Sequence, residues 1–174
     1  MSIKDITVII TTFKSGEKIK NCLNSIDSKV KVLIIENSND LELKKNIEAE
    51  FSNVECIITG NNLGYGKSNN LGLTKVTTQY ALILNPDATL HPSALENFLK
   101  TTEKITEFAI MGPYIQEKKN NNDENYLKDA SPVQVAYIKG FAMFLNLVEF
   151  KEDDAAYAEQ QFGCSASSFD PIFE

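Results

Sequence analysis

The sequence predicts an α/β fold, in which helices flank both faces of a mostly parallel central sheet and make a three-layer sandwich. Short apolar runs rich in β-branched residues alternate with segments whose apolar residues recur at helical spacing. The apolar runs are nearly continuous, as in parallel strands buried on both faces. Turn-forming residues follow several of these runs, which fits strands that end at one edge of a sheet.

Each expected element has its own local justification. Residues 6–10 are almost all β-branched, and the runs at 30–36 and 54–59 are similarly apolar. Apolar residues at three- or four-residue spacing give the intervening segments one apolar stripe each. The expected strands are 5–13, 30–36, 54–59, 80–84, 108–115 and 135–146, and the expected helices are 17–27, 41–51, about 66–75 and 92–105.

The later part of the chain changes character twice. Residues 116–132 are polar and Asn-rich, and this composition predicts a mobile surface loop. Residues 151–174 carry small and acidic residues without a clear period. We therefore expect one folded domain over 1–146, followed by an irregular or truncated segment over 147–174.

Composition excludes several function classes. The net charge of −7 argues against a nucleic-acid-binding protein, which needs a basic face. All 17 basic residues are Lys, so phosphates would have to be bound by a metal, Lys or backbone N–H groups. Three widely spaced Cys and one His suggest neither a disulfide framework nor a zinc site. We expect a cytoplasmic protein without a signal peptide or a membrane span.

The strand at 80–84 leads to the strongest candidate site. It runs directly into Asn85-Pro86-Asp87, and ligands of open α/β sheets bind at the carboxyl ends of strands. Divalent Mg or Mn typically uses one or two carboxylates together with substrate phosphates. Asp87 could therefore hold a metal that binds a nucleotide diphosphate, although Asn-Pro-Asp is equally explained as a turn.

Three other segments are expected to meet Asp87 at the same edge of the sheet. Thr11–Phe13 ends the first strand, and Glu36 and Asn37 end the second. Glu36 could accept a hydrogen bond from a base, or it could cap a helix. The Gly- and Asn-rich stretch at 62–72 could approach a ligand closely, or it could simply be the entry to a helix.

Taken in order, these segments resemble the family 2 glycosyltransferases with the GT-A (Rossmann-like) fold, and most closely their bacterial rhamnosyltransferase-like branch. The resemblance covers about residues 5–146. Single motifs are weak, whereas the ordered set is specific. The matching stretches are Val8-Ile-Ile-Thr-Thr-Phe13, Val32-Leu-Ile-Ile-Glu-Asn-Ser38, Asn62-Leu-Gly-Tyr-Gly-Lys-Ser-Asn-Asn-Leu-Gly72, Ala81-Leu-Ile-Leu-Asn-Pro-Asp-Ala-Thr-Leu90 and Tyr137-Ile-Lys-Gly-Phe-Ala-Met-Phe-Leu145.

The resemblance implies a role for each matching position. Asn85 stands first in the family's D-x-D-type motif, where Asn resembles the branch that uses dTDP-rhamnose, and Asp87 would hold Mg or Mn. Glu36, beside Asn37, would bind the base. The nucleoside pocket would be lined by Thr11, Thr12 and Phe13, and the floor near the ribose and diphosphate by Asn62, Gly64 and Asn69.

The implied reaction is inverting sugar transfer from a dTDP- or UDP-sugar to a saccharide or lipid-linked acceptor. The family's base lies in an acidic segment that follows a stretch like Phe169-Asp-Pro-Ile-Phe-Glu174, but here the sequence given stops. Asp153, Asp154 and Glu174 are the remaining candidates for the base. We therefore expect a chain that is C-terminally truncated.

Three functions stay open from the sequence alone. The first is a glycosyltransferase of cell-wall or polysaccharide biosynthesis, compatible with peripheral contact with the inner membrane through parts not in this sequence. The second is an inactive or truncated module that only binds nucleotide sugars. The third is a nucleotidyltransferase, against which stands the lack of a Gly-rich basic loop after the first strand.

Overall fold

The computed structural model describes residues 1–16, 18–105, 108, 110–112, 114–115, 137–139 and 142–147. The expected loop at 116–132 lies outside these residues, as does the expected C-terminal segment apart from Leu147. No helix in the described ranges is long and apolar enough to cross a membrane.

The described elements follow the predicted order closely. A short 3₁₀ helix, η1 (Ile3–Asp5), precedes the first strand. The strands are β1 (Ile6–Thr12), β2 (Lys31–Glu36), β3 (Val54–Ile58), β4 (Tyr80–Leu84), β5 (Thr89–Leu90), β6 (Ile110–Met111), β7 (Tyr114–Ile115), β8 (Tyr137–Lys139) and β9 (Ala142–Asn146). The helices are α1 (Lys18–Asn24), α2 (Leu41–Glu50), α3 (Tyr65–Leu73) and α4 (Ala94–Thr102).

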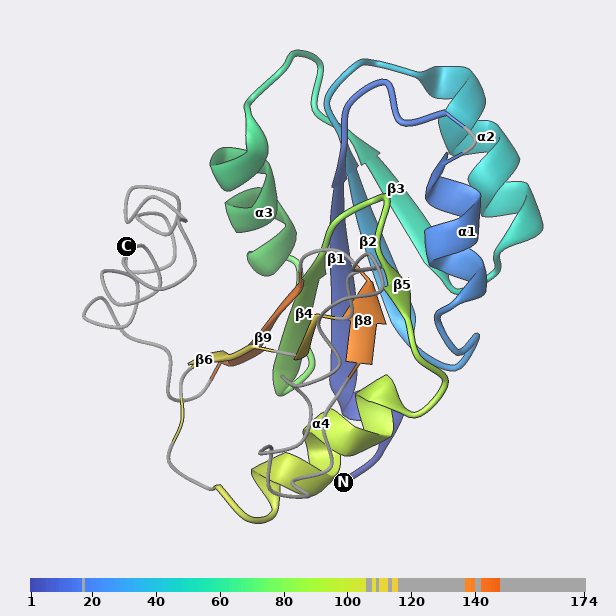
Figure 1. Ribbon diagram of the computed structural model, residues 1–174. Coiled ribbons are helices and arrows are strands. Elements are labelled where there is room, and N and C mark those ends of the chain that lie inside the picture. The colour runs from blue at the N-terminus through green and yellow to red at the C-terminus, as the bar shows by residue number, and fades with distance from the viewer. Residues whose placement is uncertain are drawn as a thin grey trace, which may run out of the picture.

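The main sheet has the strand order β3-β2-β1-β4-β9-β6. β1 to β4 are parallel to one another, and the loops that follow β1, β2 and β3 lie at the top of Figure 1. β9 runs antiparallel between β4 and β6, so the sheet is mixed but mostly parallel. The expected strands over 108–115 and 135–146 are each two strands, because β7 and β8 belong to a second small sheet with β5, whereas β6 and β9 belong to the main sheet.

The sheet separates two apolar cores, which confirms the predicted three-layer arrangement (Figure 1). On one face, α1, α2 and α4 pack over the larger core. There Phe98 of α4 stacks on Phe144 of β9 with ring centroids 4.6 Å apart. On the other face, Leu73 of α3 shares the smaller core with Ile9 and Ile35.

Gly72 allows α3 to lie very close to the sheet. A Cβ at this position would stand 2.6 Å from Cγ2 of Ile9 and 3.4 Å from Cγ1 of Ile35. Any larger residue would therefore push the helix away from β1 and β2. The close approach matters for function because α3 carries polar side chains to the carboxyl ends of those strands.

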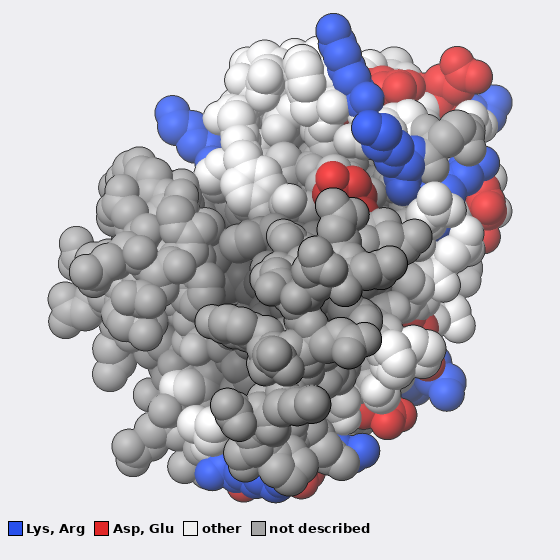
Figure 2. All heavy atoms as spheres, viewed as in Figure 1, with Lys and Arg blue, Asp and Glu red and all other residues white. Residues whose placement is uncertain are grey.

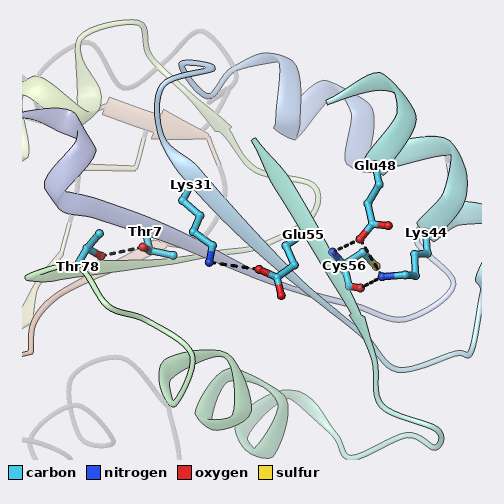
Figure 3. Close-up of polar contacts among 7 residues, drawn as sticks. All are labelled: Thr7, Lys31, Lys44, Glu48, Glu55, Cys56 and Thr78. Carbon is cyan, nitrogen blue, oxygen red and sulfur yellow. Dashed lines mark hydrogen bonds and ion pairs between the residues drawn. The ribbon is translucent and has the colours of Figure 1, made fainter. Parts of the chain in front are cut away.

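Polar contacts hold both an inner part and the β3 edge of the sheet (Figure 3). Thr7 and Thr78 share a hydrogen bond of 2.8 Å between their hydroxyls. Along β3, Glu48 of α2 accepts the backbone N–H of Cys56 at 2.8 Å, and Lys44 donates to the carbonyl of the same residue. α2 is thereby held to the edge strand β3 through the backbone of one residue, Cys56.

Candidate functional site

A cavity of about 520 Å³ lies at the carboxyl ends of β1, β2 and β4. This is the edge at which open α/β sheets bind ligands. Its volume lies in the range typical of small-molecule sites. The residues that line it are Thr11, Phe13, Lys14, Ser15, Lys18, Asn37, Asn62, Gly64, Tyr65, Asn85, Pro86 and Asp87.

The cavity brings together most of the residues singled out from the sequence. Segments far apart in the chain meet there because β1, β2 and β4 are parallel and end at the same edge. The exceptions are Thr12, Glu36 and Asn69, which do not line the cavity. All three are buried instead, and they support the residues that do.

The end of β1 supplies both a polar and an aromatic wall. The hydroxyl of Thr11 donates to Oδ1 of Asn69 on α3 at 2.7 Å, which joins strand and helix beneath the cavity. Thr12 has no exposed surface, and its carbonyl accepts the N–H of Asn37 at 2.9 Å. Phe13 is 49% exposed, so its ring is available to a ligand.

Asn37 is a cavity residue whose side chain is already oriented by its neighbours. It is buried at 3% exposure, and its amide faces the hydroxyl of Ser68 with Nδ2 and Oδ1 at 2.7 and 2.9 Å. Thr59 donates a further hydrogen bond of 3.1 Å to Oδ1. Three elements, β2, β3 and α3, therefore meet at this amide.

Glu36 has a different environment from the one expected of a base-binding residue. It has no exposed surface, and its carboxylate accepts hydrogen bonds from the backbone N–H groups of Ser38 and Asp40 at 2.9–3.0 Å. The hydroxyl of Ser38 donates to the same carboxylate. The carboxylate thus fixes the turn before α2, and a base could reach it only if this turn opened. Glu36 is thus not the solvated capping acid of the alternative interpretation, because it is buried and Asp40 is the N-cap of α2, and base binding stays a prediction.

The start of α3 forms another wall. Asn62 accepts the N–H of Gly64 at 3.0 Å through its side chain. Gly64 is the N-cap of α3 with φ of +81°, a conformation that favours glycine, and it offers no side-chain cap. The first N–H groups of α3 are consequently not covered by a capping side chain at this wall of the cavity.

Asn85 and Asp87 differ in their availability. Oδ1 of Asn85 accepts the hydroxyl of Tyr65 at 2.9 Å, so this oxygen is already engaged. Asp87 is exposed and lines the cavity. Cys22, on α1 beneath them, is buried, and this burial together with the charge of Asp87 raises the pKa of its thiol to about 12. The thiol is therefore protonated at neutral pH.

The side chains that line the cavity fit a metal that is coordinated mainly by the phosphates of a bound substrate. Within the described ranges no group of three or more His, Cys, Asp and Glu side chains could coordinate a metal by itself. Asp87 offers one exposed carboxylate, which suffices for Mg or Mn when phosphate oxygens supply other ligands. Asn85 could add its amide oxygen, which accepts one hydrogen bond from Tyr65 and keeps a second lone pair.

The sequence reasoning missed four cavity residues, which are Lys14, Ser15, Lys18 and Tyr65. The lack of Arg had left Lys as one of three possible phosphate-binding groups, beside a metal and backbone N–H groups, but nothing in the sequence singled out Lys14 and Lys18. The base candidates Asp153, Asp154 and Glu174 lie outside the described residues.

Comparisons with known proteins agree with this geometry. The family described as Glycosyl transferase family 2 matches residues 7–169. The chain is 30% identical over 115 residues to the low-salt glycan biosynthesis hexosyltransferase Agl10 of Haloferax volcanii. That match covers 64% of this chain and 36% of the relative, so the chain spans little more than a third of that protein's length.

Solved structures share the fold at low sequence identity. TarS 1–349 of S. aureus in complex with UDP-GlcNAc is 17% identical with a TM-score of 0.54, and the match covers 67% of this chain and 36% of TarS 1–349. The mannosyltransferase PcManGT of Pyrobaculum calidifontis, in complex with GDP-Man and Mn²⁺, is 18% identical with a TM-score of 0.58, over 64% of this chain and 36% of its own.

The matches to solved structures confirm the predicted GT-A-type α/β architecture. Membership of the family rests on the other match, that of residues 7–169 to Glycosyl transferase family 2. That match extends from β1 past β9 and covers every strand that contributes to the cavity. The chain belongs to glycosyl transferase family 2.

Proposed function

We propose that the cavity is the donor site of a glycosyltransferase, which moves a sugar from a nucleoside diphosphate to a saccharide or lipid-linked acceptor. The observation that carries this proposal is the meeting of Thr11, Phe13, Asn37, Asn85 and Asp87 in one cavity at the carboxyl edge of the sheet. Family membership points to the same chemistry.

The proposed roles follow from the walls of the cavity. Phe13 is exposed and can pack against the nucleoside, and Asn37 lines the nucleoside side of the cavity with its amide held by Ser68 and Thr59. Asn62 and Gly64 bring the uncapped start of α3 to the cavity, where backbone N–H groups favour an anion.

Asp87 is the residue that would hold Mg or Mn. A bound metal would offset negative charge on the departing diphosphate. Mn²⁺ accompanies GDP-Man in the mannosyltransferase PcManGT, which is consistent with this role. Asp87 is exposed, so among the described residues nothing covers it before it coordinates.

The transfer itself needs a base on the acceptor side. We propose inversion at the anomeric carbon, in which the acceptor oxygen forms the new bond while the bond to the diphosphate breaks and a carboxylate takes the hydroxyl proton. Asp153, Asp154 and Glu174 remain the proposed candidates for that carboxylate. The proposed donor is a dTDP- or UDP-sugar, and Asn85 favours dTDP-rhamnose by the family resemblance.

Calorimetry with UDP, dTDP and GDP tests the donor site. Each is titrated into the chain with MnCl₂, with MgCl₂ and with EDTA. We expect nucleoside diphosphate binding that is stronger with metal, and loss of the metal-dependent part in Asp87→Asn. Asp27→Asn is the matched control, because Asp27 lies outside the cavity and its side chain retains an acceptor for Lys29. No binding of any diphosphate under these conditions would refute the proposal.

A second assay separates transfer from binding alone. Metal-dependent release of the nucleoside diphosphate from a nucleotide sugar would exclude a module that only binds. Release of pyrophosphate from a nucleoside triphosphate and a sugar phosphate would instead support the nucleotidyltransferase alternative.

A further inference from the structure

The described lining of the cavity carries a positive charge in a protein that is strongly acidic. Among the residues that the structure describes, Lys14 and Lys18 line the cavity against one carboxylate, that of Asp87, whereas the whole chain carries a net charge of −7. Figure 2 shows Lys side chains in blue projecting from the upper part of the molecule, with acidic side chains in red nearby. A cavity with this balance favours a ligand with several negative charges.

Both lysines are free to bind such a ligand. Each side chain is exposed, and neither takes part in an ion pair within the described ranges, in contrast to Lys31 and Lys44, which pair with Glu55 and Glu48. Lys14 lies in the loop between β1 and α1, separated from the end of β1 by Phe13, and Lys18 is the first residue of α1.

The position of Lys14 is fixed by buried groups. Its backbone has φ of +52°, which is uncommon for a residue with a side chain and carries an energetic cost. Its N–H donates to the hydroxyl oxygen of Ser38 at 3.1 Å, and that hydroxyl donates to the buried carboxylate of Glu36. Its ammonium group lies 5.4 Å from the centre of the Phe13 ring.

We propose that Lys14 and Lys18 form a phosphate-binding element for the diphosphate of the donor, and that Glu36 and Ser38 act as positioning residues for Lys14. The inference rests on the proposed function, because it concerns the same cavity. It assigns the buried carboxylate of Glu36 a role other than base recognition. It also makes part of the diphosphate binding independent of the metal, since two ammonium groups can neutralise phosphate charge without it.

Calorimetry on the full chain tests the element with UDP and dTDP, and with uridine and thymidine as ligands that lack phosphate. Each ligand is titrated with MnCl₂ and with EDTA at low salt. The variants are Lys14→Gln, Lys18→Gln and the double variant. Lys75→Gln is the control for the same charge change, because Lys75 is exposed and lies outside the cavity.

We expect each single variant to weaken diphosphate binding by about five-fold, as for one exposed charge pair at contact, and the losses to multiply in the double variant. Binding of uridine and thymidine should not change. In EDTA the wild type should retain weak diphosphate binding, and the double variant should lose it. Ser38→Ala should show a smaller loss, again confined to the diphosphates.

The outcomes separate this inference from the proposed function. If the wild type binds neither UDP nor dTDP under any condition, the proposed function fails and the inference fails with it. If the wild type binds but the double variant binds the diphosphates equally well, only the inference is overturned. An equal loss for nucleosides and diphosphates would also overturn it, because a phosphate-binding element acts on the diphosphates alone.

Discussion

Replacing Gly72 by Ala should both destabilise the fold and weaken the site. The added Cβ would lie 2.6 Å from Cγ2 of Ile9, whereas carbon atoms in contact prefer about 3.5–4.0 Å. Either α3 or β1 must therefore move by about 1 Å. Ile9 has no exposed surface and lies in a strand with neighbours on both sides, so β1 has little room to yield.

The magnitude follows from two opposing effects. Overpacking of a buried site costs about 1–3 kcal/mol, and the better helix propensity of Ala returns about 1 kcal/mol. A contact of 2.6 Å with a buried side chain places the overpacking cost in the upper half of that range, about 2–3 kcal/mol, so we expect a net loss in the free energy of unfolding of about 1–2 kcal/mol. For a chain of this size each kcal/mol lowers Tm by about 2–4 °C, which differential scanning calorimetry resolves.

A displaced α3 should also be visible in ligand binding. The helix holds Ser68 and Asn69 against Asn37 and Thr11, so its movement lengthens hydrogen bonds of 2.7 Å beneath the cavity. Weaker UDP or dTDP binding should accompany the lower Tm.

A second variant checks the cause. Ile9→Leu removes the offending Cγ2 methyl group, because Leu has no branch at Cβ, and it should restore part of the stability of Gly72→Ala. The reasoning is refuted if Gly72→Ala is as stable as the wild type or more so. It is also refuted if the two changes are simply additive.

Three further predictions concern the core and the edge of the sheet. Burial raises the pKa of Cys22 from 9.0 to about 12, so thiol reagents should label this residue at pH 8.5 only after unfolding. The free energy of unfolding should fall as the pH rises from about 9, because the thiol then ionises in the unfolded chain and not in the folded one. The hydrogen bond from Lys44 lowers the pKa of Glu48; NMR titration should show this pKa rising in Lys44→Met, and the small stabilisation should be lost as pH falls through the folded value. Phe98→Ala should cost about 3–5 kcal/mol in denaturant unfolding, because it removes the ring stacked on Phe144; a loss well below 1 kcal/mol would contradict the assigned core.

Local patterns were sufficient for most of the fold. The continuous apolar runs predicted β1 to β4, because strands in the interior of a parallel sheet carry apolar residues at successive positions. The insertion of β9 between β4 and β6 could not be predicted in the same way. Pairing between strands so distant in the chain depends on which edge of the sheet remains open, and no local period encodes that.

The candidate site, like the fold, could be predicted only in part from the sequence. Its place at Asp87 and the end of β1 was predictable, because parallel strands end at one edge. The surroundings of Glu36 were not, because they depend on how residues 37–40 turn back onto its carboxylate. Lys14 and Lys18 carried no pattern of their own, and only the folded loop shows that both line the cavity.

The contacts of α2 with Cys56 have a consequence for the behaviour of the protein at high concentration. β3 is an outermost strand of its sheet, and a bare outer strand invites a strand of another molecule to pair with it. Here the outward N–H and carbonyl of Cys56 are occupied by Glu48 and Lys44, and the N–H of Val54 is taken by the carbonyl of Phe51. The side chains of Glu48 and Lys44 thus occupy backbone groups that a neighbouring strand would otherwise bind, and they discourage intermolecular pairing along β3.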